Sequence, residues 1–304
     1  MSNPLGHGST AGIGSKVGSM APGALTSFNP DPVPGFPDTR SAIVRVAWTP
    51  LRRDPSHRSE MTNQLVLGEV VELLEQPADA WLTVRAADGY EGQVTTGALR
   101  QVGEADAVAW TAAADGFSLG TGLEPAGHAP WGARLARAGD GGFLLPDGDR
   151  VNARRPERIV FGPERALAYE ADAAAAARTA REWMGTPYQW GGRIRAGADC
   201  SGFVQAVYGL HGIRLPRDSR DQFEAGPRLP DEADHATRGR SGDLWFFAWD
   251  DGPVSHVGIC LGNGAMIHAS ETRGAVAIDR IGEGEFGRRL AAGLVGATRP
   301  ERRS

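Results

Sequence analysis

The feature that most constrains this fold is the spacing of turn-forming residues between 41 and 160. Apolar runs in this region are short, and Gly, Pro and Asp-Gly pairs separate them. In residues 80–94, strand-like alternation lies on both sides of an Asp-Gly pair, which predicts a β-hairpin. Short strands at short intervals are typical of small β-barrels. We therefore expect two successive β-modules, over 41–103 and 104–165.

The second module is expected to consist of strands as well. "AVAW" at 107–110 and "ERIV" at 157–160 have the composition of short strands, and the Gly-Asp-Gly-Gly and Pro-Asp-Gly segments between them form turns. Residues 1–40 are rich in Gly, Ser and Pro, so we expect an N-terminal extension without a core of its own.

The pattern changes after residue 166. The segment 171–185, "ADAAAAARTAREWMG", is rich in helix-forming residues and ends in a glycine, which predicts a helix. Another helix is expected near 200–211, and three apolar strand-like runs follow it. This order predicts a single α+β domain over 166–304.

Composition excludes several classes of protein. The net charge of −5 leaves no basic surface for nucleic acid or anionic lipid. No apolar run approaches the roughly 20 residues of a membrane span. The first residues lack the apolar stretch of a secretory leader, so we expect a cytoplasmic protein, in which a disulfide is disfavoured. Nothing in the sequence indicates an oligomeric state.

One of the two cysteines lies where a thiol can become a nucleophile. Apolar residues from Phe203 to Leu210 recur at helical spacing, which places Cys200 at a helix N-terminus with Asp199 as the N-cap. Free N–H groups and the helix dipole favour an anion there, so we expect a lowered thiol pKa. A packed, inert cysteine is the alternative. Cys260 lies within an apolar run, and we interpret it as part of the core.

A nucleophilic cysteine needs a base, and two histidines flank a predicted hairpin. His256 and His268 lie on strands joined by a Gly-Asn-Gly segment. Side chains alternate between faces, so the two rings share a face if Gly262, Asn263 and Gly264 all form the loop, but not if the loop is Asn263-Gly264 alone. The catalytic hypothesis requires the odd loop, with His256 as base and His268 orienting it.

Two other interpretations of the histidines remain open at this point. They can be structural residues bonded to backbone carbonyls, or part of a Cys-His-His zinc site. The zinc site lacks clustered ligand spacing such as C-x-x-C, so the sequence predicts no metal and no other cofactor.

Six segments occur in one order along the C-terminal part: "GTPYQWGG", "DCSGF", "LPRDSRDQ", "GDLWFF", "SHVGICLG" and "MIHAS". Over about 166–300 they resemble the NlpC family of bacterial cell-wall cysteine endopeptidases, and the upstream β-modules resemble bacterial SH3-like domains. The resemblance implies an α+β, papain-like cysteine peptidase domain preceded by two small SH3-like β-barrels. It implies Cys200 as nucleophile, His256 as base and His268 as the third polar residue.

The resemblance also implies a substrate. Family members cleave murein peptides between γ-D-glutamate and a diamino acid, and one subgroup acts on free peptides that begin with L-Ala. In that subgroup the first SH3-like domain helps to hold the N-terminal amine, and the matching residues here are Glu60 and Tyr90. The positions that match the lining of the site are Tyr188, Asp199, Ser201 and Ser219.

Other functions fit the same residues, because a fold does not determine a reaction. The thiol can serve a cell-wall amidase or an acyltransferase, and the chain can also be a non-catalytic wall-peptide-binding protein.

Overall fold

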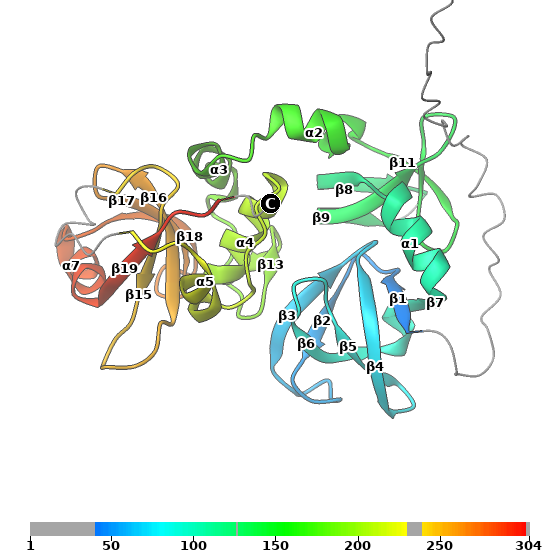
Figure 1. The fold of residues 1–304 in the computed structure, drawn as a ribbon, viewed down its shortest axis with the longest axis horizontal. Helices are drawn as coiled ribbons and strands as arrows, with labels where there is room; N and C mark the ends of the chain where they lie inside the picture. The colour runs from blue at the N-terminus through cyan, green and yellow to red at the C-terminus, as the bar shows by residue number, and fades with distance from the viewer. Residues whose placement is uncertain (1–39, 126, 230–238, 302–304) are drawn as a thin grey trace, which may run out of the picture. The chain divides into compact units, whose positions relative to one another are not determined.

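The computed structural model describes residues 40–125, 127–229 and 239–301 (Figure 1). Residues 1–39, and with them nearly all of the expected N-terminal extension, lie outside the described ranges. Among the helices within these ranges, none combines the length and apolar character needed to cross a membrane.

The first module is a seven-stranded antiparallel sheet with the strand order β3-β2-β6-β5-β4-β1-β7. The hairpin predicted over 80–94 is present: Trp81 pairs with Thr95 and Arg85 with Glu91. The apolar side chains that alternate along these strands fill one core, including Leu51, Leu65 and Leu82. The strands are β1 (Ser41–Val44), β2 (Trp48–Arg52), β3 (Met61–Val66), β4 (Val70–Ala78), β5 (Trp81–Arg85), β6 (Glu91–Thr95) and β7 (Leu99–Val102).

The second module begins with a helix where we expected a strand. Residues 107–110 lie within α1 (Glu104–Ala113), so the strand prediction for "AVAW" is wrong. Alanine and glutamate favour helix, and Glu104 and Asp106 in the first turn complement the helix dipole. Trp110 is buried and donates its indole N–H to the Gly68 carbonyl, 2.8 Å away, which fixes this helix to the first module.

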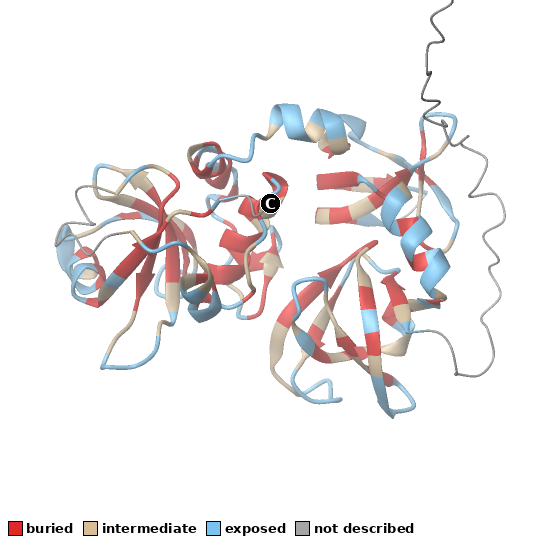
Figure 2. Ribbon diagram, viewed as in Figure 1, coloured by how far each residue is buried: buried red, intermediate tan, exposed pale blue. Residues whose placement is uncertain are grey.

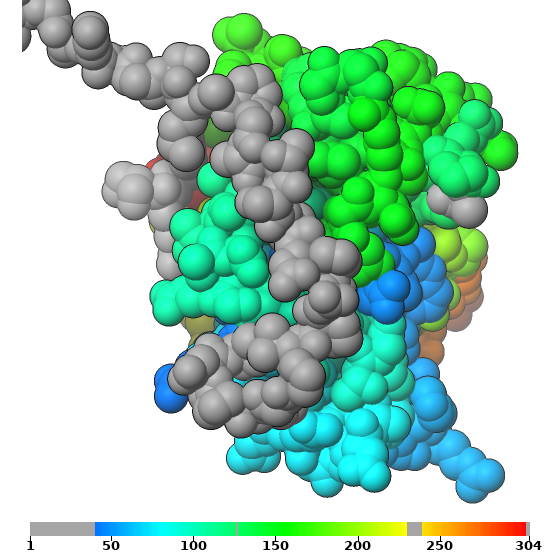
Figure 3. Space-filling view, turned by 90° about the vertical axis from the view of Figure 1, so that its right-hand side faces the viewer, coloured from blue at the N-terminus to red at the C-terminus, as the bar shows by residue number. Residues whose placement is uncertain are grey.

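A five-stranded antiparallel sheet of order β11-β10-β9-β8-β12 follows α1. Figure 3 shows the surfaces of both modules, with the first in blue and cyan and the second in turquoise to green. The elements are β8 (Gly116–Glu124), β9 (His128–Arg137), β10 (Phe143–Leu144), β11 (Arg150–Ala153), β12 (Ile159–Val160) and α2 (Gly162–Ala168).

The second sheet shares a hydrophobic core with the C-terminal region. Phe117, Leu119 and Trp131 belong to the same buried cluster as the side chains of α3 (Ala173–Ala180) and α4 (Cys200–Leu210). The Trp131 indole donates to the Ala206 carbonyl, 3.0 Å away, on α4. The second module is therefore packed against the helix that begins with the cysteine.

The C-terminal region combines these helices with a five-stranded antiparallel sheet of order β18-β17-β16-β15-β19. One face of the sheet packs on α4, which is buried along most of its length (Figure 2), and the other face packs on α7. This is the expected mixture of helices and strands. The remaining elements are β13 (Arg193–Ile194), β14 (Gly197–Ala198), α5 (Ser219–Ala225), β15 (Leu244–Phe247), β16 (His256–Gly262), β17 (Ala265–Ser270), β18 (Ala275–Arg280), α7 (Gly284–Gly293) and β19 (Leu294–Thr298).

Candidate active site

Cys200 is the first residue of α4, as the sequence predicted. Asp199 is the N-cap, and its carboxylate accepts a hydrogen bond from the Gly202 N–H at 2.7 Å. The Cys200 thiol lies 4.0 Å from the carbonyl of Ser255, the residue before His256. Both cysteines are free thiols in the structure. The fold thus brings the thiol to the start of the strand that carries the expected base.

The pKa of Cys200 differs from the sequence-based expectation. Burial, and next the charge of Asp199, raise the pKa of this thiol to about 12, although N–H groups of Val257 and Ser201 oppose the shift. The helix start therefore does not outweigh the loss of solvation. Burial also raises the pKa of Cys260 to about 11. Cys260 is fully buried in the core, as expected.

The two histidines share a face of the sheet, but through a different loop from the one we expected. The loop is the two-residue turn Asn263-Gly264, because β16 ends at Gly262 and β17 begins at Ala265. By alternation alone this turn would place the rings on opposite faces. The register, however, shifts between Cys260 and Gly262, which is a β-bulge. The extra residue of the bulge shifts the alternation of side chains by one position, so both rings lie on the same face, as the catalytic hypothesis requires.

The histidine rings form a chain of hydrogen bonds that continues beyond the expected pair. His256 Nε2 lies 2.7 Å from His268 Nδ1, and His268 Nε2 lies 3.0 Å from Asp279 Oδ2. Asp279 in turn accepts from Arg273 Nη2 at 2.5 Å. Both ring nitrogens of His268 are engaged, so this residue has none free for a zinc ion. Burial, and next the neighbouring His268, lower the pKa of His256 to about 3.

These shifts define the resting state of the site. The raised pKa keeps the Cys200 thiol protonated at neutral pH, and the lowered pKa keeps the His256 imidazole uncharged. His256 is therefore an unprotonated base that can accept the thiol proton during attack on a substrate.

Asp199 is anchored within the protein. Its carboxylate accepts from Gly191 N–H at 2.9 Å and forms a two-pronged ion pair with Arg217, at 2.7 and 3.0 Å. Arg217 is 2% exposed and also donates to Ser201 Oγ at 3.0 Å and to Asn63 Oδ1 of the first module at 2.8 Å. Asp199 therefore organises the helix start, and its contact with a substrate amine stays a prediction.

The first module reaches the catalytic region through Glu60. The Glu60 carboxylate accepts from the indole N–H of Trp190 at 2.7 Å and pairs with Arg53 at 2.5 Å. Trp190 is two residues beyond Tyr188 and is 61% exposed. Tyr90 is half-buried, and burial followed by the charge of Asp218 raises its pKa. Glu60 also contributes to raising the pKa of Tyr90, so the two residues lie near each other, and their roles in binding an amine stay predictions.

The other predicted lining residues occupy different kinds of position. Burial, and next the charge at Cys200, raise the pKa of Tyr188, so this hydroxyl lies near the thiol. Ser201 is buried and bonded to Arg217, whereas Ser219 is the buried first residue of α5. No described contact links Ser219 to the thiol or the histidines.

Four residues of the site were missed by sequence reasoning: Asp279, Arg217, Asp218 and Trp190. Arg217 and Asp218 belong to the "LPRDSRDQ" segment, and Trp190 belongs to "GTPYQWGG", so their motifs were available. Burial raises the pKa of Asp218, and the charge of Arg217 opposes that shift. Asp279 belongs to none of the six segments.

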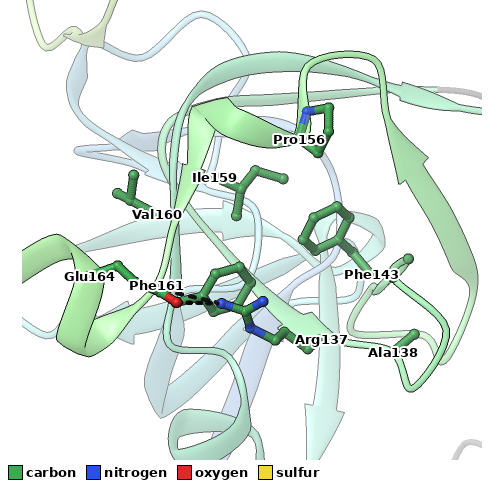
Figure 4. Close-up of a pocket in the computed structure, with 10 residues that line it drawn as sticks. Arg137, Ala138, Phe143, Pro156, Ile159, Val160, Phe161 and Glu164 are labelled. Carbon is green, nitrogen blue, oxygen red and sulfur yellow. Dashed lines mark hydrogen bonds and ion pairs between the residues drawn. The ribbon is translucent and has the colours of Figure 1, made fainter.

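A separate hollow of about 440 Å³ lies in the second module (Figure 4). The rings of Phe143 and Phe161 stack along it, 6.2 Å apart. Arg137 lies 3.6 Å above the Phe161 ring and pairs with Glu164 at 3.1 Å. Its lining residues include no cysteine, serine or histidine nucleophile and none of the predicted site residues.

A thiol at a helix start and a histidine chain on an antiparallel sheet are the arrangement found in papain-like cysteine peptidases. Residues 185–295 match the sequence model of the NlpC/P60 family, and residues 51–99 match the bacterial dipeptidyl-peptidase Sh3 domain. The chain therefore carries an NlpC/P60 domain preceded by a bacterial SH3 domain, which confirms the resemblance to the NlpC family.

Curated relatives carry related names. A γ-D-glutamyl-L-lysine dipeptidyl-peptidase of Bacillus subtilis is 36% identical over 118 residues, or 38% of each chain. The Bacillus cereus protein of the same name is 36% identical over 137 residues, 44% of this chain and 39% of its own. A probable endopeptidase p60 of Listeria innocua is 40% identical over 92 residues, 30% of this chain and 18% of its own. The match thus spans about two fifths of the first two relatives.

Solved structures confirm the fold. An NlpC/P60 family protein from Bacillus cereus has a TM-score of 0.71 at 22% identity, covering 85% of this chain and 99% of that protein. An NlpC/P60 endopeptidase from Photobacterium damselae has a TM-score of 0.61 at 18% identity, covering 85% and 70%. At these identities the similarity establishes the α+β architecture and not the substrate.

Proposed function

We propose that this protein is a cysteine endopeptidase that cleaves the bond between γ-D-glutamate and a diamino acid in murein peptides with a free N-terminal L-Ala. The observation that carries the proposal is the contact of Glu60 in the first SH3-like module with Trp190, 2.7 Å away, close to the helix that bears Cys200. The names of the two Bacillus relatives support the same reaction.

The first module is held against the peptidase region by several polar contacts. Arg193 N–H donates to Gln64 Oε1 at 2.8 Å, and Gln205 donates to Asp88 at 2.9 Å. A module fixed in this way limits the peptidase site on one side. We infer that the N-terminus of a short peptide fits there, whereas cross-linked wall does not.

The charges near this contact suit a free amine. The charges of Asp218 and Glu60 both contribute to raising the pKa of Tyr90, after burial, so two carboxylates and one hydroxyl lie near one another. An ammonium group prefers such oxygens, because charge-assisted hydrogen bonds are the stronger kind. A blocked N-terminus would lose these bonds.

The reaction follows from the neutral resting pair. His256 takes the proton of Cys200 as the sulfur attacks the γ-glutamyl carbonyl, and the oxyanion is stabilised by the Cys200 N–H and the Tyr188 hydroxyl. The protonated His256 gives its proton to the leaving amine of the diamino acid. Water then hydrolyses the thioester, which releases L-Ala-γ-D-Glu and restores the thiol.

The test compares L-Ala-γ-D-Glu-L-Lys, its meso-diaminopimelate analogue and N-acetylated forms of both. We expect cleavage of the free peptides only, loss of activity in Cys200→Ala, and a KM at least 10-fold higher in Glu60→Gln. The exposed Glu75, in the same module, gives the control Glu75→Gln, which should behave as wild type. Equal cleavage of acetylated peptides would refute amine recognition.

Product analysis separates the alternatives. A cut at the sugar–peptide amide would identify an amidase, and transfer of the acyl group to an acceptor other than water would identify an acyltransferase. Peptide binding without turnover would identify a binding protein. We further propose that the protein acts on soluble peptides in the cytoplasm, which cell fractionation tests.

A further inference from the structure

We propose that Asp279 is a positioning residue that fixes the tautomers of His268 and His256, so that His256 presents an unprotonated Nδ1 at the site. The meaning of this assignment for catalysis rests on the proposed peptidase function. The hydrogen-bond chain itself does not depend on any substrate.

Arg273 lies at the outer end of the hydrogen-bond chain, and its guanidinium only donates hydrogen bonds. Its Nη2 lies 2.5 Å from Asp279 Oδ1 and its Nε lies 3.3 Å from Oδ2. Both carboxylate oxygens therefore act as acceptors, and Asp279 is ionised. The hydrogen bond from His268 also lowers the pKa of Asp279 to about 2, against the opposing effect of burial.

An ionised Asp279 determines the proton on His268. The carboxylate only accepts, so His268 Nε2, 3.0 Å from Oδ2, must carry a hydrogen and donate it. A neutral imidazole has one N–H, which leaves His268 Nδ1 as an acceptor. The ring is fully buried, and the Phe286 ring stacks beside it at 6.2 Å.

The acceptor nitrogen of His268 in turn determines the position of the proton on His256. His256 Nε2 lies 2.7 Å from the acceptor nitrogen of His268, so Nε2 must be the donor. The remaining nitrogen, Nδ1, then keeps its lone pair. A general base for a thiol needs such a lone pair, so Asp279 acts on the reaction through two rings.

The register between β17 and β18 places the Asp279 carboxylate beside His268. His268 on β17 pairs with Ala277 on β18, and Asp279 lies two residues further along, on the same face. Asp279 is 8% exposed, so water competes little for its oxygens.

An isosteric change tests the assignment. In Asp279→Asn the amide oxygen should face Arg273 Nη2, because a guanidinium cannot accept from the amide NH2 group. The NH2 group then faces His268 Nε2 and forces it to become an acceptor. Both rings must reverse their tautomers, and Nδ1 of His256 becomes an N–H.

The experiment reads the tautomers directly, in protein labelled with ¹⁵N-histidine. We expect Nε2–H on both rings in the wild type and in Asp279→Glu, and Nδ1–H on both in Asp279→Asn. Iodoacetamide labelling of Cys200 should slow at least 10-fold in Asp279→Asn. The kcat for the peptide should fall ~10²–10⁴-fold, with KM changed less than about threefold.

Asp243 provides a matched control. It is also buried, at 1% exposed, and pairs with Arg299 at 2.6 Å, away from the histidines in sequence and bonding. Asp243→Asn also weakens a buried ion pair, yet it should leave both tautomers and the labelling rate of Cys200 unchanged.

Two results would overturn the proposal. One is Nδ1–H on His268 in the wild type, which needs no variant to fold. The other is Asp279→Asn retaining Nε2–H on both rings. If the wild type shows Nε2–H and the variant reverses it, but no peptide is cleaved, then the proposed function fails and the role of Asp279 stands.

Discussion

Replacement of Arg217 by Met tests how the helix start is stabilised. Arg217 is 2% exposed and is bonded to Asp199, Ser201 and Asn63. Arg217→Met keeps the apolar stem of the side chain and removes every donor. The Asp199 carboxylate then keeps its N–H partners but loses its buried counter-charge.

The expected loss of stability follows from that uncompensated charge. Removing one partner of a buried ion pair costs about 3–5 kcal/mol in the free energy of unfolding. For a unit of this size each kcal/mol lowers Tm by about 2–4 °C, so we expect a decrease of at least about 6 °C. Removing both charges should cost less than the sum of the two single losses, by about 1–3 kcal/mol.

The assay is urea unfolding and thermal unfolding of four proteins: wild type, Arg217→Met, Asp199→Asn and the double variant. Arg220→Met is the control, because Arg220 is 65% exposed and pairs with Glu224 only at the surface. We expect that control to cost under about 0.5 kcal/mol. A cost below about 1 kcal/mol for Arg217→Met, or strictly additive losses, would refute the reasoning.

Three further outcomes are expected. Trp131→Ala should lower the free energy of unfolding by about 3–5 kcal/mol, because it leaves a cavity in the core shared with α4. Trp48 is partly exposed, so Trp48→Ala should lower it by under about 1 kcal/mol. Equal losses of stability in urea unfolding would contradict the shared core. The rate of alkylation of Cys200 should increase with pH up to about pH 10, because burial raises the pKa of this thiol, and Cys260 should stay unlabelled. A rate that is already constant below pH 7 would indicate a preformed thiolate. His256 takes up a proton near pH 6.5 in the unfolded chain but only near pH 3 in the folded protein, so the free energy of unfolding should fall as the pH decreases between these values. In calorimetry, His256→Gln should make this dependence of stability on pH weaker. An unchanged dependence on pH in that variant would count against the burial of this ring.

Sequence reasoning succeeded where local chemistry decides the structure. Helical spacing after Cys200 and the capping ability of Asp199 locate the start of α4 without any tertiary information. The helix α1 was equally local, and the error at 107–110 came from giving a short apolar run more weight than alanine and glutamate propensity.

The rest depends on contacts that local patterns do not contain. The bulge between Cys260 and Gly262 decides which face the histidines share, and a bulge depends on the pairing of two strands. Asp279 lies one strand further away, so it can be found only once the register of β17 and β18 is known. The pKa of Cys200 depends on burial by the whole fold, which outweighs the helix start.

The cluster that joins Phe117 and Trp131 to α4 limits how this protein can be divided. A fragment that starts at residue 166 would lack β8 and β9, whose aromatic side chains pack against α4, the helix that begins with Cys200. In such a fragment the apolar side chains of α4 that contact these strands would be exposed to water, so the fragment is expected to aggregate. The shortest fragment that folds should therefore keep β8 and β9. The second module thus belongs structurally to the C-terminal domain as well as to the N-terminal β-modules.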